Sequence, residues 1–389
     1  MGKRKIAMFF LGPFPKGNVS TIRIISYCKE LVKTNNEVIV YLLAPTNEAK
    51  INAHKVGEFE GIKYKYLSKI TWNKVNVSIF NKIYYYFLGL FLGLRELRNN
   101  RFDYVFTYHF NPFFNIIYSI YLRNRGIKFV LDKTEYPKGF QRANFIQKCF
   151  IKFNLKRFDK ILTISFELTK FYGNIIGNEN VFHLPMSVSP SRFFGLKRNF
   201  DVVDYIGVVF GVHNRDNIKD CILAFLEYCK NCRYDNQLEL HLIGDFDKLL
   251  KLNTNLEFLR ELIAKNERIK LVGIMDNEDI PQYLINSYCL MSSPLEFISG
   301  GFPTKLGEYL LSSRPVIITD VGEISYYLKD NIHGLLCNPG DLKALASKIE
   351  KLRLNSFNAE KIGANGKNLA LSAFNSKYYI NDLINFLKK

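Results

Sequence analysis

Long apolar runs, paired cysteine motifs and secretory signals are scarce or missing in this sequence. No stretch of its 389 residues approaches the ~20 uninterrupted apolar residues that a transmembrane helix needs. The basic residues 3–5 lead directly into the strand-like run Ile6–Leu11, with no small-residue cleavage site behind it. The seven cysteines include one C-x-x-C pair, Cys229 and Cys232, a pattern that favours free thiols over disulfides or a zinc site. We therefore expect a cytoplasmic protein.

Acidic residues are scarce in the first half of the chain. Residues 1–200 hold 32 Lys and Arg against 12 Asp and Glu, whereas residues 201–389 hold 22 against 24. The whole excess of the +18 formal charge therefore lies in the first half. Such a surface attracts either nucleic acid or anionic lipid headgroups, and composition alone does not separate the two.

One aromatic segment favours the lipid alternative. Tyr84–Phe87 runs into the apolar stretch Leu88–Leu94, and the basic residues Lys82, Arg95, Arg98 and Arg101 flank both. Aromatic and leucine side chains beside cations are typical of a helix that lies in the headgroup region, and the apolar run is too short to span a bilayer. The alternative is a buried helix that packs on the first sheet.

Strand-like apolar runs alternate with longer amphipathic stretches along the chain. Such alternation predicts parallel sheets covered by helices, and two series of runs predict two Rossmann-like domains. With 48% hydrophobic residues, the chain can form two cores. We place the linker near Pro185–Asn199, where proline and glycine interrupt the pattern. The predicted strands are Ile6–Leu11, Val38–Leu43, Tyr104–Tyr108, Lys128–Leu131 and Lys160–Ile164, then Val202–Val209, Leu238–Ile243, Ile269–Ile274, Tyr288–Met291 and Val316–Thr319.

The segment from Gly300 to Asp341 has the chemistry of a nucleotide-binding βα unit. Its two glycines free the backbone to approach a ligand, and Pro303 favours a helix start just after them. A helix N-terminus binds anions, so the amides of Phe302, Thr304 and Lys305 are candidate ligands of a diphosphate. Glu308, about one and a half turns along this helix, is a candidate acceptor for ribose hydroxyls.

The same segment carries a family resemblance. The segment contains the pattern F-P-T-K-L-x-E-Y-L, followed by P-V-I-x-x-D-V-G and G-L-L-x-x-P-G-D. This pattern resembles the donor-binding half of the retaining glycosyltransferases of family 4, which have the GT-B fold. Phe158–Ser165 is similar to the last strand of that family's N-terminal domain, and Leu184–Val188 to its interdomain linker. The resemblance implies an N-terminal acceptor-side domain at 1–190, a donor-binding domain at 200–375 and a helix at 376–389 that returns to the first domain. It also implies that the two domains face each other across a cleft.

The resemblance also assigns site residues. It implies that Gly17, in the loop after the first strand, lies beside the sugar and diphosphate, and that His109, at the carboxyl end of a strand, contacts the donor sugar and acts in catalysis. Arg215, or else Lys219, neutralises the leaving diphosphate; the family's usual arginine-then-lysine wording is absent there. The remaining implied donor residues are Met275 beside the base, Gly301, Phe302, Pro303, Thr304 and Lys305 beside the diphosphate, and Glu308 on the ribose.

Two acidic positions receive no role in this prediction. The family usually carries a second glutamate eight residues before the ribose-binding one, and here that position is Gly300, while Glu296 lies four residues too early. Asp245 and Asp247 form a D-x-D triplet, but its position matches a structural turn of the GT-B pattern. We therefore expect neither a catalytic role for Glu296 nor a metal at the triplet.

The sequence thus predicts a retaining, metal-independent glycosyltransferase without a cofactor, using a UDP- or GDP-linked sugar. The acceptor is expected to be a lipid-linked or surface-polysaccharide glycan, as in a bacterium, and the enzyme to contact the anionic inner face of the plasma membrane without binding nucleic acid. A nucleotide-sugar epimerase of the same fold is the main alternative. Such enzymes depend on several carboxylates and a histidine in the cleft, and the first half offers few candidate carboxylates beyond Asp132 and Glu135. A basic nucleic-acid-binding protein is the other, although no recognition motif supports it.

Overall fold

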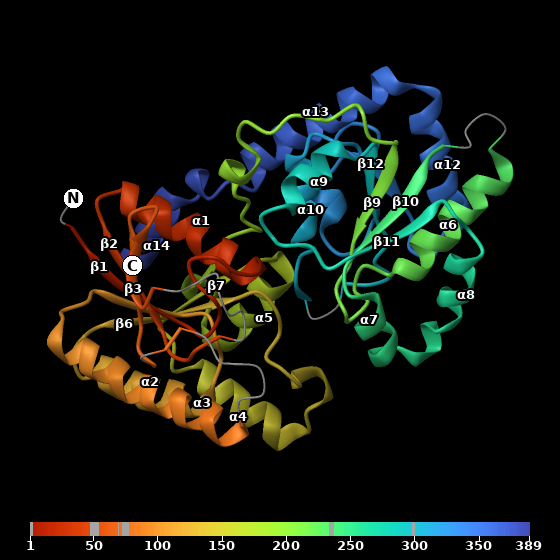
Figure 1. Cartoon of the computed structure of the whole chain (residues 1–389). Helices are drawn as coiled ribbons and strands as arrows, with labels where there is room; N and C mark the ends of the chain where they lie inside the picture. Colours follow the sequence, from red (N-terminus) through yellow and green to blue (C-terminus); the bar gives the residue numbers. More distant parts are fainter. Residues whose placement is uncertain (1–2, 47–53, 69, 72–77, 233–236, 298–299) are drawn as a thin grey trace. The chain divides into compact units, whose positions relative to one another are not determined.

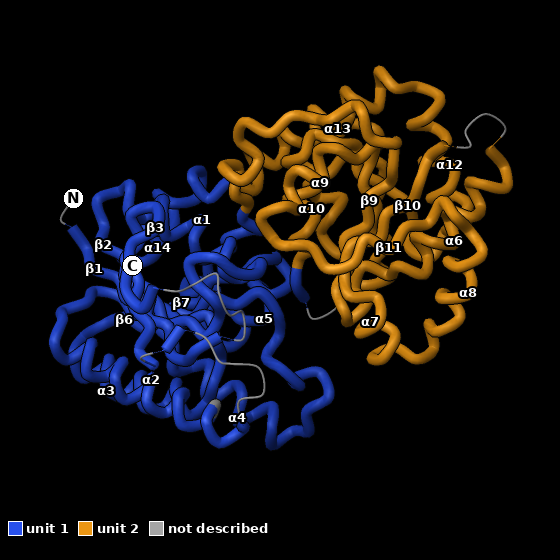
Figure 2. The backbone as a smooth tube through the Cα atoms, viewed as in Figure 1, with its two compact units in different colours: residues 1–187, 299–301, 375–389 blue, residues 188–298, 302–374 orange. Residues whose placement is uncertain are grey.

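The computed structural model describes residues 3–46, 54–68, 70–71, 78–232, 237–297 and 300–389 (Figure 1). The chain divides into two compact units (Figure 2). Unit 1 comprises residues 1–187, 299–301 and 375–389, and unit 2 comprises residues 188–298 and 302–374. The division between 187 and 188 lies inside the predicted linker, and the C-terminal segment from 375 belongs to unit 1.

Unit 1 is built on one mixed sheet in the order β3-β4-β2-β1-β5-β6-β7-β8. All neighbouring strands are parallel except β3 and β4, which form an antiparallel pair at one edge. The strands are β1 (Lys5–Phe10), β2 (Glu37–Leu42), β3 (Val56–Phe59), β4 (Ile62–Tyr66), β5 (Tyr104–Thr107), β6 (Lys128–Lys133), β7 (Lys160–Thr163) and β8 (Val181–His183). The helices are α1 (Val19–Lys33), α2 (Ile79–Asn99), α3 (Pro112–Arg123), α4 (Phe145–Leu155), α5 (Phe166–Ile176) and α14 (Ile380–Lys388).

Successive side chains of β1 point to opposite faces of this sheet. Met8 packs in the core cluster that includes Ile24 of α1 and Leu383 of α14. Phe9 points the other way and its ring lies 5.1 Å from that of Tyr118 on α3. A strand that is buried on both faces has a continuous apolar sequence, so such strands could be recognised from the sequence.

Unit 2 contains a parallel sheet in the order β11-β10-β9-β12-β13-β14. Its strands are β9 (Tyr205–Val209), β10 (Glu239–Ile243), β11 (Ile269–Gly273), β12 (Cys289–Ser292), β13 (Val316–Thr319) and β14 (Leu335–Cys337). Its helices are α6 (Ile218–Asn231), α7 (Phe246–Leu252), α8 (Phe258–Ala264), α9 (Ile280–Asn286), α10 (Lys305–Leu311), α11 (Ile324–Tyr327), α12 (Leu342–Leu354) and α13 (Ser356–Ala373). The core between the sheet and helices α6 and α12 is almost entirely aliphatic and aromatic.

Asparagine caps start several of the helices. Asn18 accepts hydrogen bonds from the amides of Ser20 (3.1 Å) and Thr21 (3.5 Å) at the start of α1, and Asn111 caps α3 with Pro112 at its first position. Asn144 forms a capping box with Gln147 at the start of α4. Each cap satisfies amides that the first helical turn leaves without an intrahelical partner.

Each strand predicted from the sequence is present; Val316–Thr319 has the predicted ends, and the others differ at one or both ends. The first strand of unit 2 begins at Tyr205 rather than Val202, because Val202 and Val203 are exposed and outside the sheet. The expectation that Phe158–Ser165 forms the last strand of the N-terminal domain was wrong. The short strand β8 follows it and pairs with β7 through Ile161 and Val181.

Candidate functional site

Each sheet has one point where the strand order changes direction. In unit 1 the chain proceeds from β1 to β2 on one side and returns to β5 on the other side of β1. In unit 2 it proceeds from β9 to β10 and β11, then returns to β12 on the other side of β9. Open α/β sheets bind ligands at the carboxyl ends of the strands that flank such a switch point. The candidate site residues are therefore sought in the loops after β1, β5, β9 and β12.

In unit 2, Asp216 joins the segments at the switch point. Its carboxylate accepts a hydrogen bond from the Gly211 amide (3.1 Å) and forms an ion pair with Lys305 at the start of α10. The Asp216 carbonyl accepts from the amide of Ser293, directly after β12 (3.1 Å). The last residue of β9 donates its amide to the Tyr309 hydroxyl (2.7 Å). The loops after β9 and β12 and the first turns of α10 therefore form one connected structure.

Two buried polar atoms at this switch point lack hydrogen-bond partners among the described residues. They are Nδ2 of Asn217, which is 4% exposed, and Oγ of Ser293, which is fully buried. Asn217 immediately precedes α6, whose N-terminus carries partial positive charge. Buried polar groups are normally satisfied, so these two atoms have unused capacity for a bound ligand or water.

The predicted diphosphate cations lie beside these atoms in the chain. Arg215 is exposed, and Lys219 lies in the first turn of α6 with its ammonium 3.7 Å from the carboxylate of Asp220. Lys305 is partly buried and holds Asp216. A helix start with several cations and unsatisfied donors is a suitable environment for a phosphate group.

Glu308 is already paired in this structure. It forms an ion pair with Arg192, which also donates from Nη2 to the side-chain oxygen of Asn277 (3.1 Å). Burial lowers the pKa of Arg192 to about 10, and nearby Glu278 opposes that shift. Glu308 lies in the first turn of α10, not one and a half turns along, because the helix begins at Lys305 instead of Pro303. A ribose bound to Glu308 would replace or share this arginine.

The residues just before α10 have distinct environments. Phe302 is 7% exposed and packs on Phe374 with ring centroids 5.6 Å apart, so its side chain belongs to the core. The Pro303 carbonyl accepts the Leu306 amide (3.0 Å), and Thr304 is the N-cap residue without a side-chain cap.

The two glycines at 300–301 group with unit 1. A Cβ on Gly301 would lie 2.8 Å from the carbonyl oxygen of Thr134, and Gly300 has a left-handed backbone with φ of +66°. The Gly300 carbonyl accepts the hydroxyl of Ser165 at 2.5 Å. Glycine is thus required here for close approach to the protein's own backbone, a reason that the sequence did not reveal.

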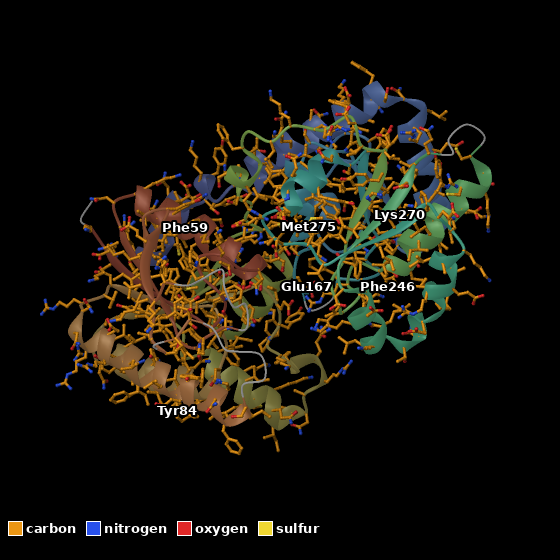
Figure 3. The ribbon with its side chains drawn as sticks, viewed as in Figure 1. Phe59, Tyr84, Glu167, Phe246, Lys270 and Met275 are labelled. Atoms are coloured by element: carbon orange, nitrogen blue, oxygen red, sulfur yellow. The ribbon has the colours of Figure 1, made fainter. Side chains whose placement is uncertain are left out.

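Met275 lies in the loop after β11 (Figure 3). Gly273 before it has φ of +82°, and its carbonyl accepts the Gly244 amide at 2.9 Å. Of the D-x-D triplet, Asp245 accepts the Lys248 amide (3.0 Å) as the cap of α7, and Asp247 pairs with Arg260 (3.1 Å). Both carboxylates therefore have structural partners.

In unit 1, Gly17 lies in a tightly packed loop after β1. A Cβ on Gly17 would lie 2.8 Å from the Pro13 carbonyl oxygen, which also accepts the Thr21 hydroxyl (2.6 Å). The loop is further held by Tyr66, whose hydroxyl donates to the Phe14 carbonyl (2.9 Å). This rigid loop presents its backbone at the switch point beside β5.

His109 lies two residues after β5, at the same switch point. Its ring stacks on Phe10 with centroids 5.4 Å apart, and its Nε2 is buried without a hydrogen-bond partner in the described part of the chain. Burial, with a smaller contribution from the Lys133 ammonium, lowers the pKa of His109 to about 4. The imidazole is therefore neutral near pH 7, and Nε2 is available to hydrogen-bond a ligand.

Sequence reasoning missed four polar residues near these sites: Lys133, Arg192, Asn217 and Ser293. Lys133 ends β6, and burial lowers its pKa. Ser293 directly follows β12. Their position at the carboxyl ends of strands was a signal in the sequence. Arg192 and Asn217 carried no such signal, since their contacts depend on how distant segments meet.

Known proteins resemble this chain in sequence over part of its length and in fold over nearly all of it. Residues 202–355 match the family model described as glycosyl transferases group 1. The matched segment covers most of unit 2. A curated relative, alpha-1,3/1,6-mannosyltransferase ALG2 of Dictyostelium discoideum, is 32% identical over 161 residues, which are 39% of this chain and 36% of that protein. The match thus spans about a third of the length of this relative.

Solved structures show the fold of the whole chain. Sucrose-phosphate synthase from Thermosynechococcus elongatus superimposes with a TM-score of 0.74 at 14% identity, over 99% of each chain. HepE from Anabaena, solved in complex with UDP-glucose, superimposes with a TM-score of 0.71 at 14% identity, again over 99% of each chain. The predicted GT-B fold, with two α/β units on parallel sheets, is therefore confirmed.

Proposed function

We propose that the protein is a retaining glycosyltransferase that moves a sugar from a UDP- or GDP-linked donor to a hydroxyl of a glycan acceptor. The observation that carries this proposal is the switch point of unit 2. There, the buried donors of Asn217 and Ser293 have no partner among the described residues, and Lys305 lies in the same connected structure. This site falls within the segment that matches the group 1 family model.

In this proposal each side chain has a defined task. Glu308 holds the ribose, while Arg215, Lys219 and Lys305 neutralise the diphosphate together with the backbone of Gly301–Lys305. Met275 and its neighbours contact the base. These cations stabilise the charge that develops on the leaving diphosphate, so the mechanism invokes no metal ion.

Retention of configuration requires attack on the face that the diphosphate leaves. The bond between the anomeric carbon and the phosphate oxygen breaks, and the acceptor oxygen bonds to the same carbon on the same face. The acceptor proton passes to the departing phosphate oxygen, so no protein nucleophile is needed. We assign His109 and the Gly17 loop to the sugar; the low pKa of His109, about 4, supports a neutral hydrogen-bonding role for it.

The proposed acceptor is lipid-linked. Support comes from the basic first half of the chain, with 32 Lys and Arg against 12 Asp and Glu. Acceptors that carry a lipid phosphate are anionic and are presented at a membrane surface, where basic residues accumulate favourably. Among the described residues, no helix is both long and apolar enough to cross a bilayer. The proposed location is therefore the inner face of the plasma membrane, by surface contact.

A thermal-shift panel tests the donor site. UDP, GDP and their sugar conjugates are added to wild-type protein and to Glu308→Gln, because a ligand that binds the folded state stabilises it by mass action. We expect one nucleotide family to raise the melting temperature of the wild type and to lose most of that effect in the variant.

A matched carboxylate elsewhere provides the control. Glu261→Gln changes an exposed glutamate on α8 that pairs with Lys265 at the end of the same helix, so it should keep the full shift. The proposed donor site would be contradicted if no nucleotide raised the melting temperature of the wild type, or if Glu308→Gln showed the same rise as the wild type.

A further inference from the structure

Helices α2, α3 and α4 lie along one face of the unit 1 sheet (Figure 1). Side-chain contacts join them: the rings of Phe87 and Phe113 are 5.4 Å apart, and the Tyr118 hydroxyl donates to the Leu90 carbonyl at 2.9 Å. Arg157, just beyond α4, donates to the hydroxyl of Ser119 on α3 (3.3 Å). The three helices thus form one continuous layer.

The inner side of this layer is closely packed. Gly89 and Gly93 of α2 have no room for a side chain, since a Cβ would contact the Leu43 carbonyl group and the Phe9 ring, respectively. Leu90 and Leu97 are buried beside them. Part of the sequence-based alternative, a helix packed on the sheet, is therefore correct.

The outer face of the same layer carries large apolar side chains that contribute little to the core. Figure 3 shows Tyr84 on the outer side of α2. We define the outer face by six residues: Phe80 (82% exposed), Tyr84 (60%) and Phe91 (67%) on α2, and Phe145 (81%), Ile146 (77%) and Phe153 (57%) on α4. An exposed apolar surface of this extent is typical of an interaction site.

The charges of the layer are almost all positive. Glu96 is the only acidic residue within the bounds of α2, α3 and α4, and it is held by Lys65 at 2.6 Å. Arg95 and Arg98 on α2, Arg123 on α3 and Lys152 on α4 are exposed. A second copy of this face would bring like charges together, so charge complementarity requires an anionic partner.

We infer that the outer face docks on an anionic lipid bilayer, with the aromatic and isoleucine side chains inserted at the headgroup boundary. Exposed isoleucine and phenylalanine side chains gain free energy by entering the acyl region, whereas nucleic acid binds through phosphate contacts and stacking. The basic residues on all three helices then contact lipid phosphates. This inference rests on the proposed function for its biological purpose, because a lipid-linked acceptor is presented at such a surface.

Vesicle sedimentation tests the inference with the full chain. Wild-type protein should sediment with vesicles of phosphatidylcholine containing phosphatidylglycerol, and much less with phosphatidylcholine alone. The double variant Phe80→Ser/Phe145→Ser should lose at least tenfold in binding at every salt concentration. The variant Arg95→Glu/Arg98→Glu should lose binding mainly at low salt, because screening weakens charge attraction.

Two control variants carry matched changes in unit 2. Phe357→Ser removes a phenylalanine that is 79% exposed on α13, and Lys251→Glu reverses an exposed charge on α7. Both should sediment as the wild type does. Circular dichroism and the thermal shift with nucleotide report whether each variant is folded and whether its donor site is intact.

The outcomes separate this inference from the proposed function. Loss of sedimentation with an unchanged nucleotide shift supports the docking face, and lack of any nucleotide shift in a wild type that still sediments contradicts only the proposed function. The inference is overturned if the wild type does not bind anionic vesicles, or if the outer-face variants bind them as the wild type does. A dimer in light scattering, or RNA binding, that the outer-face variants abolish would assign the face to that partner instead.

Discussion

The basic side chains at the carboxyl edges of the two sheets have different environments. In unit 2, Lys305 pairs with Asp216 and Arg192 pairs with Glu308. In unit 1, burial lowers the pKa values of His109 and Lys133, and Nε2 of His109 has no hydrogen-bond partner among the described residues. Similar strand–helix architecture thus supports ion pairs of the basic groups Lys305 and Arg192 at one edge and a buried, neutral imidazole, that of His109, at the other. The first suits exchange of an ion pair for a charged ligand, and the second suits contact with neutral hydroxyls.

The largest expected effect concerns buried charge in unit 1. Asp132 of β6 is fully buried and pairs with Arg23 of α1 at 2.9 Å, and Arg23 also donates to the carbonyls of Leu184 and Pro185. Asp132→Ala leaves the arginine buried without its counter-ion and should cost about 3–5 kcal/mol of unfolding free energy. Urea unfolding, monitored by hydrogen exchange in β1 and β6, measures this loss of unfolding free energy.

The control is an exposed ion pair in unit 2. Asp247→Ala removes one partner of Arg260, which also pairs with Glu257 (3.0 Å), and the side chains of Asp247 and Arg260 are 73% and 52% exposed. Its cost should be far smaller than that of Asp132→Ala, because solvent screens an exposed pair. Similar losses in the two variants would contradict the contrast between a buried and an exposed pair.

The next effect is acid sensitivity of unit 1. Burial is the main cause that lowers the pKa of both His109 and His183 to about 4 from an ordinary value near 6.5. Between these values the unfolded chain binds more protons than the folded one, so the stability of unit 1 should fall as the pH drops from about 6.5 to 4.

His109→Phe tests the source of this sensitivity. Phenylalanine preserves the ring stacked on Phe10 but has no proton to bind. The loss of stability between pH 7 and pH 5, measured by urea unfolding, should become smaller than in the wild type. An unchanged loss would show that His109 is not desolvated as the structure indicates.

A smaller effect is expected at the donor site of unit 2. Asn217→Ala removes a buried amide that has no protein partner in the described ranges, so it should weaken binding of the diphosphate by roughly fivefold, the value of one hydrogen bond of about 1 kcal/mol. Isothermal titration with the nucleotide found in the panel measures the change. Asn231→Ala, at the exposed end of the same helix, is the control, since its side chain bonds to Glu227 of that helix. Equal affinity of the two variants would remove Asn217 from the site.

The smallest expected effect is a change in the pKa of His109 in unit 1. The Lys133 ammonium is the second cause, after burial, of the low pKa of His109. Lys133→Met should therefore raise that pKa, although it should stay below 6.5 because the ring remains buried. Histidine titration by NMR measures the shift. His183 is an internal control, because its pKa is lowered by burial and Arg23 and not by Lys133.

The sequence predicted the fold well where strands are buried on both faces, as in β5, β7, β12 and β13. It missed β3, β4, β8 and β14. Residues of β3 alternate between exposed and half-buried positions, those of β4 alternate between buried and more exposed positions, and β8 and β14 are three residues long. None of these four strands therefore has the apolar run that marked the other strands.

The candidate site was only partly predictable. Residues such as Lys305 and Glu308 belong to a local pattern and could be selected as candidates, although their ion pairs with Asp216 and Arg192 were not foreseen. The outer face was foreseen only on α2; its continuation on α4 depends on Phe145, Ile146 and Phe153, which the sequence does not mark as surface residues.

The sequence by itself determined the alternating strands and helices, the asparagine caps and the basic first half, because these features depend on neighbouring residues or on composition. Only the tertiary structure decided which polar groups meet. Asp216 and Lys305 are 89 residues apart, and Arg23 and Asp132 are 109 residues apart. Their proximity follows from strand order and helix packing, which bring distant segments to one edge of a sheet. Local periodicity defines the elements, whereas burial of their apolar faces against one another defines the site.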